Sequence, residues 1–138
     1  MELTRRNAIL LGASAFVVAG LPFRASASTE DAIAAFTGGA EVGAGDISVT
    51  APEIAENGNT VPIEVSSETA VEIMVLATGN PTPSVATFKF GKLAASRAAS
   101  TRIRLAGTQD VVAIAKLEDG SFVQASSTVK VTIGGCGG

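Results

Sequence analysis

The sequence contains no histidine, tryptophan or tyrosine, and its only cysteine is Cys136. Without an imidazole, the chain has neither a Ser-His-Asp triad nor a Cys-His pair for nucleophilic catalysis. A single cysteine excludes an intrachain disulfide, and with histidine absent it also excludes a clustered His/Cys zinc site. We therefore expect no catalytic residues of the chain's own, no metal and no cofactor.

The chain is short, with 138 residues, and this length suits one domain. Hydrophobic residues make up 46% of it and charged residues 17%, which is enough apolar material to fill a core. Its aromatic residues are six phenylalanines. The core must therefore be packed mainly by small aliphatic side chains.

Residues 1–27 have the features of an export signal. An apolar run over 8–21, interrupted mainly by Gly and Ser, precedes the small residues Ala25 and Ala27 of a cleavage site. The mature protein would begin at Ser28. The run is shorter than the roughly 20 apolar residues of a typical membrane span, so we expect no membrane attachment in the mature form.

The arginine pair Arg5 and Arg6 indicates the route of export. Its surroundings resemble a twin-arginine signal, although Ala8 and Leu10 replace the usual Phe and Lys, and ordinary secretion or a retained anchor are the alternatives. Proteins exported by this route cross the membrane folded, sometimes with a bound partner. We predict a periplasmic location.

Removing Arg5, Arg6, Arg24 and Glu2 from the 10 basic and 13 acidic residues leaves 7 and 12, a net charge of −5. This charge argues against nucleic acid as a ligand. The charges are also segregated along the chain, because 30–72 contains nine acids and no base, and 89–104 five bases and no acid. Solvated strand faces or a surface that steers a partner would both explain this pattern.

The mature chain begins with a short helix and continues as strands. Ser28 and Thr29 can cap the helix, and Gly38 and Gly39 end it. From Asp46 onward the apolar residues alternate with polar ones, which is typical of β-strands. The apolar positions of the expected strands are Ile47, Val49, Val61, Ile63, Val65, Val71, Ile73, Val75, Ala86, Phe88, Phe90, Ile103, Leu105, the segments 111–117 and 121–125, Val129, Val131 and Ile133.

Three segments carry sharper expectations. Pro62 predicts an edge strand or a bulge, because proline cannot donate to a ladder. The segment 71–76 is apolar on both faces, so we expect a central strand there. Asp119-Gly120 predicts a type I′ hairpin, in which both residues have positive φ.

These elements predict an all-β fold for 28–133, an immunoglobulin-like antiparallel β-sandwich with a short N-terminal helix, and a small barrel is the alternative. The apolar residues Val71, Ile73 and Met74 suggest more strand surface than one small sandwich buries. On this basis we expect a partner protein to cover part of it.

Residues 134–138 form the motif Gly-Gly-Cys-Gly-Gly at the end of the chain. Four glycines, Gly134, Gly135, Gly137 and Gly138, flank Cys136 and have no side chains to pack, so we predict a flexible swinging arm that carries the thiol. Five residues would let it reach roughly 16 Å from the last strand. No basic residue adjoins the cysteine, so its activation would have to come from a visiting enzyme.

Two segments, VKVTIGGCGG at 129–138 and STRIRLA at 100–106, resemble the SoxY sulfur-carrier subunits of Sox thiosulfate-oxidising systems. The resemblance implies that Cys136 is the site of covalent sulfur attachment and that the protein is a carrier, not an enzyme. It also implies a heterodimer with a SoxZ-like subunit. Three further partners follow from it: a c-type cytochrome that couples thiosulfate to the cysteine, a hydrolase that releases sulfate, and a sulfur dehydrogenase.

Two other functions are compatible with the same terminus. Ubiquitin-like sulfur carriers also end in Gly-Gly, but they are activated with ATP in the cytoplasm, whereas the leader predicts export. A structural immunoglobulin-like domain could use Cys136 as an intermolecular disulfide.

Overall fold

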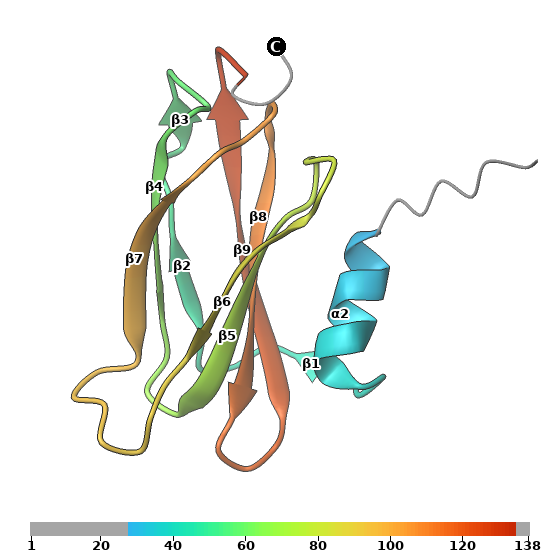
Figure 1. Cartoon of the computed structure of the whole chain (residues 1–138), viewed down its shortest axis with the longest axis vertical. Helices are drawn as coiled ribbons and strands as arrows, with labels where there is room; N and C mark the ends of the chain where they lie inside the picture. The colour runs from blue at the N-terminus through green and yellow to red at the C-terminus, as the bar shows by residue number, and fades with distance from the viewer. Residues whose placement is uncertain (1–27, 135–138) are drawn as a thin grey trace, which may run out of the picture.

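The computed structural model describes residues 28–134, which form two packed β-sheets and one helix (Figure 1). In chain order the elements are α2 (Thr29–Thr37), β1 (Val42–Gly43), β2 (Ser48–Thr50), β3 (Ile54–Ala55), β4 (Val61–Ser66), β5 (Ala70–Ala77), β6 (Ser84–Lys89), β7 (Ala98–Ile103), β8 (Gln109–Leu117) and β9 (Phe122–Val131).

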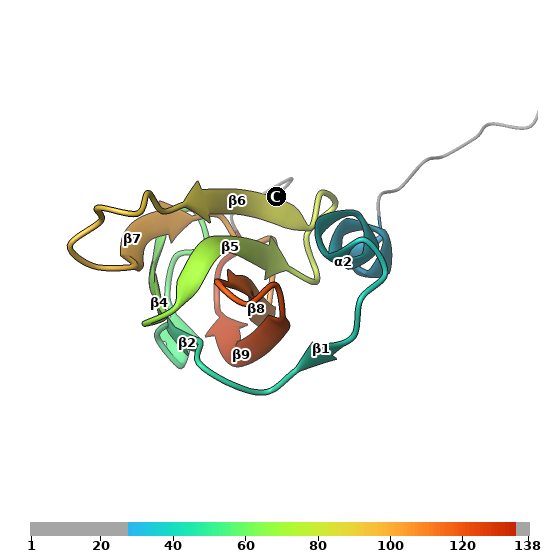
Figure 2. The ribbon, with the colours of Figure 1, turned by 90° about the horizontal axis from the view of Figure 1, so that it is seen from below.

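The larger sheet has the strand order β1-β9-β8-β5-β6, with β3 also paired to β9, and the smaller has the order β2-β4-β7. The two sheets face each other, and α2 lies beside the larger sheet (Figure 2). The predicted immunoglobulin-like sandwich is thus confirmed, and the barrel alternative is not. Among the strands of residues 28–134, only the two-residue strands β1 and β3 pair in parallel, both with β9.

The core lies between the sheets and is built from small aliphatic residues, as the composition predicts. Its fully buried members include Val61, Val65, Leu105, Val111 and Val129. Phe88 and Phe90 pack against it from the side of β6. Long side chains are few, so close contact between the sheets depends on the β-branched residues.

Strand β4 is the middle strand of the small sheet, so the predicted edge position is wrong for the strand as a whole. Its register with β7 is continuous from Val61 to Ser66, without the alternative bulge. On its other side, however, β2 pairs only with Glu64 to Ser66. Pro62 lies beyond that pairing, and its missing N–H therefore interrupts no ladder there.

Strand β5 is a central strand with both faces buried, as predicted, because β6 and β8 flank it. Ile73 and Val75 face the core between the sheets. Met74 and Leu76 face the other way and pack with residues of α2. Ile73 and Met74 are thus covered within the chain, so of the three residues that suggested a partner only Val71 stays partly exposed.

Helix α2 has the predicted boundaries. Ser28 accepts a hydrogen bond from the Asp31 N–H at 3.1 Å, and the Asp31 side chain accepts one from the Ser28 N–H, forming a capping box. The helix ends at Gly38, whose φ of 66° is the left-handed conformation that glycine adopts without strain. These caps hold the helix where its apolar side covers β5.

The β8–β9 hairpin has a different turn from the one predicted. Gly120 has a φ of 86°, but no other residue among 28–134 except Gly38 and Gly39 has a positive φ, so Asp119 does not adopt the type I′ geometry. The Gly120 N–H donates to the Leu117 carbonyl, and the Leu117 N–H donates to the Ser121 carbonyl. This is a type I turn followed by a glycine bulge, the common form of longer hairpin loops.

Candidate functional site at the end of strand β9

Gly134 is the one residue of the predicted site that the structure describes. The other predicted positions lie outside the described residues: the arm residues Gly135, Cys136, Gly137 and Gly138, and the leader residues Arg5, Arg6, Ala25 and Ala27. The candidate site is therefore the part of the domain from which the cysteine-bearing segment departs.

Strand β9 is one continuous strand of ten residues that ends at Val131 instead of reaching Ile133. Beyond it, the chain stays hydrogen-bonded to the segment that contains β3. The Thr132 N–H donates to the Ala55 carbonyl at 3.0 Å, and the Thr132 hydroxyl donates to the Glu56 carbonyl at 2.9 Å. These bonds continue the β3–β9 pairing past the end of the strand.

The backbone of Gly58 is hydrogen-bonded both to Ile133, after β9, and to Leu105, in the loop before β8. Its N–H donates to the Ile133 carbonyl at 2.8 Å, and its carbonyl accepts from the Leu105 N–H at 2.8 Å. Gly134 follows directly and lies against the Ala106 backbone, so closely that an added Cβ would overlap the Ala106 carbonyl oxygen. The segments 55–58 and 104–108, which we call the exit loops, therefore contact the chain from two sides.

Two buried or half-buried amide side chains fix the second exit loop. Asn80 donates from Nδ2 to the Arg104 carbonyl at 2.8 Å, and its Oδ1 accepts from the Ala106 N–H at 2.9 Å. Gln109 donates from Nε2 to the same Asn80 oxygen at 2.9 Å and to the Gly107 carbonyl at 3.0 Å. The position of the Ala106 carbonyl thus depends on Asn80 and Gln109.

This network could not be predicted from the sequence. In the sequence, Asn80 is part of a Gly-Asn-Pro segment that interrupts a strand, and no prediction concerns Gln109. The partners of Asn80 lie 24 to 29 residues away along the chain, whereas Gln109 bonds both Asn80 and the nearby Gly107. An asparagine between a glycine and a proline was the one signal in the sequence, because turn asparagines commonly bond nearby backbone.

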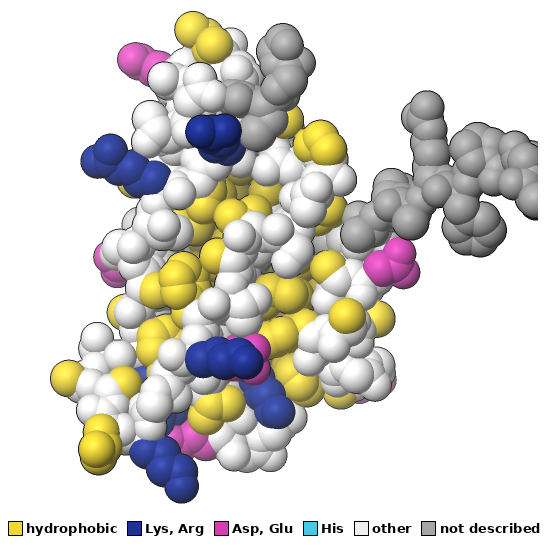
Figure 3. All heavy atoms as spheres, in the orientation of Figure 1, with side chains coloured by type: hydrophobic (Ala, Val, Ile, Leu, Met, Phe, Trp, Pro, Cys, Tyr) yellow, Lys and Arg dark blue, Asp and Glu magenta, His cyan; other side chains and the backbone are white. Residues whose placement is uncertain are grey.

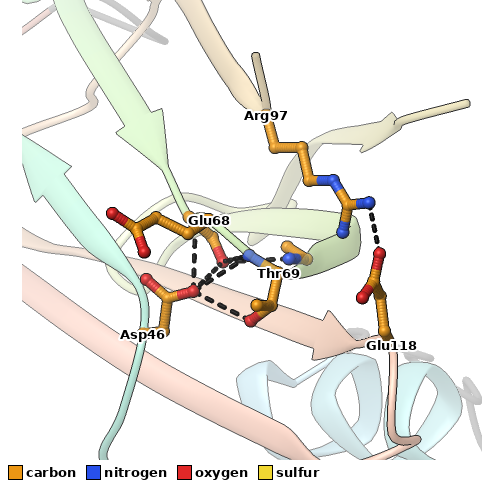
Figure 4. Close-up of polar contacts among 7 residues, drawn as sticks. Asp46, Glu68, Thr69, Arg97 and Glu118 are labelled. Atoms are coloured by element: carbon orange, nitrogen blue, oxygen red, sulfur yellow. Dashed lines mark hydrogen bonds and ion pairs between the residues drawn. The ribbon is translucent and has the colours of Figure 1, made fainter. Parts of the chain in front are cut away.

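The opposite end of the domain is held by Asp46. Its Oδ2 accepts from the Thr69 hydroxyl at 2.8 Å, the Ser67 hydroxyl at 3.0 Å, and the N–H groups of Glu68 and Thr69 (Figure 4). The Thr69 hydroxyl bond is the largest cause that lowers the pKa of Asp46 below its usual 3.8, and desolvation opposes it. Asp46 thereby ties the segment before β2 to the β4–β5 turn.

The acidic and basic stretches of the sequence meet in the fold. Glu72 lies opposite Lys89 across the β5–β6 pair, and β4 of the acidic stretch pairs with β7 of the basic one. Arg97 also forms an ion pair with Glu118, which lies outside both stretches (Figure 4). On the face shown in Figure 3, basic and acidic side chains are interspersed. This arrangement favours solvated strand faces over a single surface that steers a partner.

Among residues 28–134, no three His, Cys, Asp or Glu side chains lie close enough together to hold a metal ion. The described helix is also too short to cross a membrane.

The fold and the site define a class: a small immunoglobulin-like domain in which two exit loops contact Ile133 and Gly134, just before the cysteine-bearing segment. The family model of the sulfur oxidation protein SoxY matches residues 33–136. The structure of the sulfur carrier protein SoxY from Chlorobium limicola f thiosulfatophilum is 34% identical, with a TM-score of 0.67 over 79% of this chain and 100% of that one. The chain belongs to the SoxY family of sulfur carriers.

More distant structures share the fold alone. A superoxide reductase (neelaredoxin) from Ignicoccus hospitalis is 16% identical, with a TM-score of 0.56 over 63% of this chain and 80% of that one. A hypothetical protein from Pyrococcus horikoshii is 13% identical, with a TM-score of 0.54 over 64% and 96%. No curated protein sequence matches the chain significantly.

Proposed function

We propose that this protein is a periplasmic covalent sulfur carrier in thiosulfate oxidation, and that sulfur intermediates are held on Cys136. The observation that carries the proposal is the extent of the family match, which runs to residue 136 and so includes the chain's only cysteine. Because no imidazole accompanies this thiol, the chemistry would be performed by partner enzymes.

Loading forms one S–S bond. The Cys136 thiolate joins the outer sulfur of thiosulfate, giving a cysteine S-thiosulfonate, and two electrons leave to a c-type cytochrome. In a hydrolase, water then attacks the sulfur of the terminal sulfonate group. Sulfate and two protons are released, and a persulfide anion stays on Cys136. A sulfur dehydrogenase would oxidise the remaining outer sulfur.

The leader and the family support the setting of this chemistry. Arg5 and Arg6 would direct export by the twin-arginine route, with cleavage after Ala27, and the mature chain would pair with a SoxZ-like subunit. Helix α2 begins directly after the predicted cleavage site, with Ser28 as its N-cap. The mature chain would therefore contain the whole described domain, which agrees with export in the folded state.

Intact-mass spectrometry tests the proposal. The mature protein with its SoxZ-like subunit is incubated with thiosulfate and the oxidising cytochrome, and then digested. We expect a mass increase of one thiosulfate group, confined to the peptide ending in Gly138 and removed by a thiol reductant. The Cys136→Ser variant is the matched control and should gain nothing. An adduct on another peptide, or none, would overturn the proposal.

Non-reducing electrophoresis tests the structural alternative. In a domain joined through a Cys136 disulfide, protein from its native compartment would be quantitatively dimeric on a non-reducing gel. A carrier would instead run as a single chain on the gel, and mass spectrometry would detect its added sulfur.

A further inference from the structure

We propose that Gly134 is a fixed base of the cysteine-bearing segment and not part of a swinging arm, and that Asn80 is the positioning residue that keeps it so. This inference deepens the carrier role proposed above and rests on it. Its structural part stands on the exit loops alone and can fail independently of sulfur chemistry.

The first step is the pair of contacts that the exit loops make with Ile133 and Gly134. The Ile133 carbonyl is hydrogen-bonded to Gly58, and the next residue, Gly134, lies against the Ala106 backbone, where an added Cβ would come within 3.3 Å of the carbonyl carbon. Glycine is required at 134 for this close approach. The sequence-based reason, freedom of the backbone, does not apply there.

The second step is what holds the Ala106 carbonyl in place. Asn80 bonds the backbone on both sides of Leu105, through the Arg104 carbonyl and the Ala106 N–H. A half-buried amide with its donor and its acceptor both satisfied is costly to displace. The backbone of Ala106, which Gly134 contacts, is therefore held in place by side-chain hydrogen bonds and is harder to displace than a free loop.

The third step concerns reach. Cys136 is two residues beyond Gly134, so covalent geometry keeps their Cα atoms within about 7 Å of each other. This is less than half of the roughly 16 Å expected for an arm that starts at the last strand. An enzyme that receives the thiol must therefore approach the end of the domain formed by the exit loops.

A spin label on Cys136 measures this directly, because the chain has one thiol. A nitroxide is attached to the mature protein in complex with its subunit, and the relaxation enhancement of each backbone amide is recorded by NMR. In the wild type we expect the strongest broadening at residues 54–58 and 104–108. In Gly134→Ala it should fall at least twofold there, because the Cβ cannot fit.

Gly107→Ala is the matched control, since an added Cβ at this neighbouring exit-loop position meets nothing within 4 Å. It should keep the wild-type profile. Asn80→Ala should reproduce the profile of Gly134→Ala without touching the terminal segment. If Gly134→Ala kept the wild-type profile, the fixed base would be refuted, whatever the result of the thiosulfate loading experiment.

Discussion

Phe36 of the helix and Phe122 of β9 meet edge to face, with ring centroids 5.7 Å apart and planes at 72°. This is a preferred geometry for aromatic pairs. Around it, α2 covers Met74, Leu76 and Ile114 on the outer face of the large sheet. The helix thus covers a second core. Such a cover is needed because β5 is apolar on both faces and only one of them lies between the sheets.

Replacing Phe36 by Ala should lower the free energy of unfolding by about 2 kcal/mol, less than for a fully buried phenylalanine because Phe36 is half-buried. It should also increase the binding of a hydrophobic dye by exposing the second core. Urea unfolding and dye fluorescence measure both effects. Ala34→Ser, at an exposed position of the same helix, should change stability by less than about 0.5 kcal/mol. Equal stability of Phe36→Ala and wild type would show that the helix is not needed as a cover.

Cys136→Ser should abolish thiosulfate loading and leave the free energy of unfolding within about 0.5 kcal/mol of wild type. The reason is that the substitution removes the nucleophilic thiolate and keeps nearly the same size. Mass spectrometry and thermal unfolding of the same preparation provide the two measurements. A large loss of stability would instead assign the cysteine a structural role.

The Asp46 carboxylate should make stability depend on pH in the acid range. Hydrogen bonds lower its pKa in the folded state below the usual 3.8, so its contribution is complete above about pH 5 and is lost as the pH falls through the folded pKa. Asp46→Ala should cost about 1 kcal/mol at pH 7, and the difference from wild type should shrink toward pH 3. Asp46→Asn keeps one acceptor oxygen and removes the titration, so its stability should lose this acid-range component. A difference between Asp46→Ala and wild type that does not change with pH would contradict the assignment.

Two exposed aliphatic side chains test where the proposed processing enzymes dock. Ile54 belongs to β3, beside the exit loops, and is 59% exposed, whereas Leu93 is fully exposed in the β6–β7 loop at the other end of the domain (Figure 1). If the enzymes approach the exit loops, Ile54→Ser should raise KM for enzymatic processing severalfold with little change in kcat. Leu93→Ser is the matched control and should have no effect. The reverse ranking, measured in the same steady-state assay, would place the docking surface elsewhere.

Several features of the fold follow from local sequence and could be predicted. The boundaries of α2 depend on Ser28 and Gly38, whose capping chemistry acts within a few residues. The central position of β5 follows from its two apolar faces, since a strand buried on both sides reads as an apolar run. The family resemblance also depends on short contiguous segments, above all the terminal motif around Cys136.

Features that depend on the neighbours of a residue could not be predicted in this way. Pro62 indicated an edge strand, but what matters is the limited length of β2 beside it. Asp119-Gly120 favoured a two-residue turn, but the paired register of Lys116 with Phe122 leaves a longer loop that a glycine bulge fits better.

The sequence by itself determined the class of fold, the helix caps and the presence of one thiol in a glycine-rich terminus, because these depend on residue type and on spacing of a few positions. Only the tertiary structure decided that Ile73 and Met74 are covered within the chain, that acidic and basic stretches face each other, and that Gly134 lies against Ala106. Each of these brings together residues far apart in the sequence. Such contacts are set by the packing of the two sheets and the helix, and no local pattern records them.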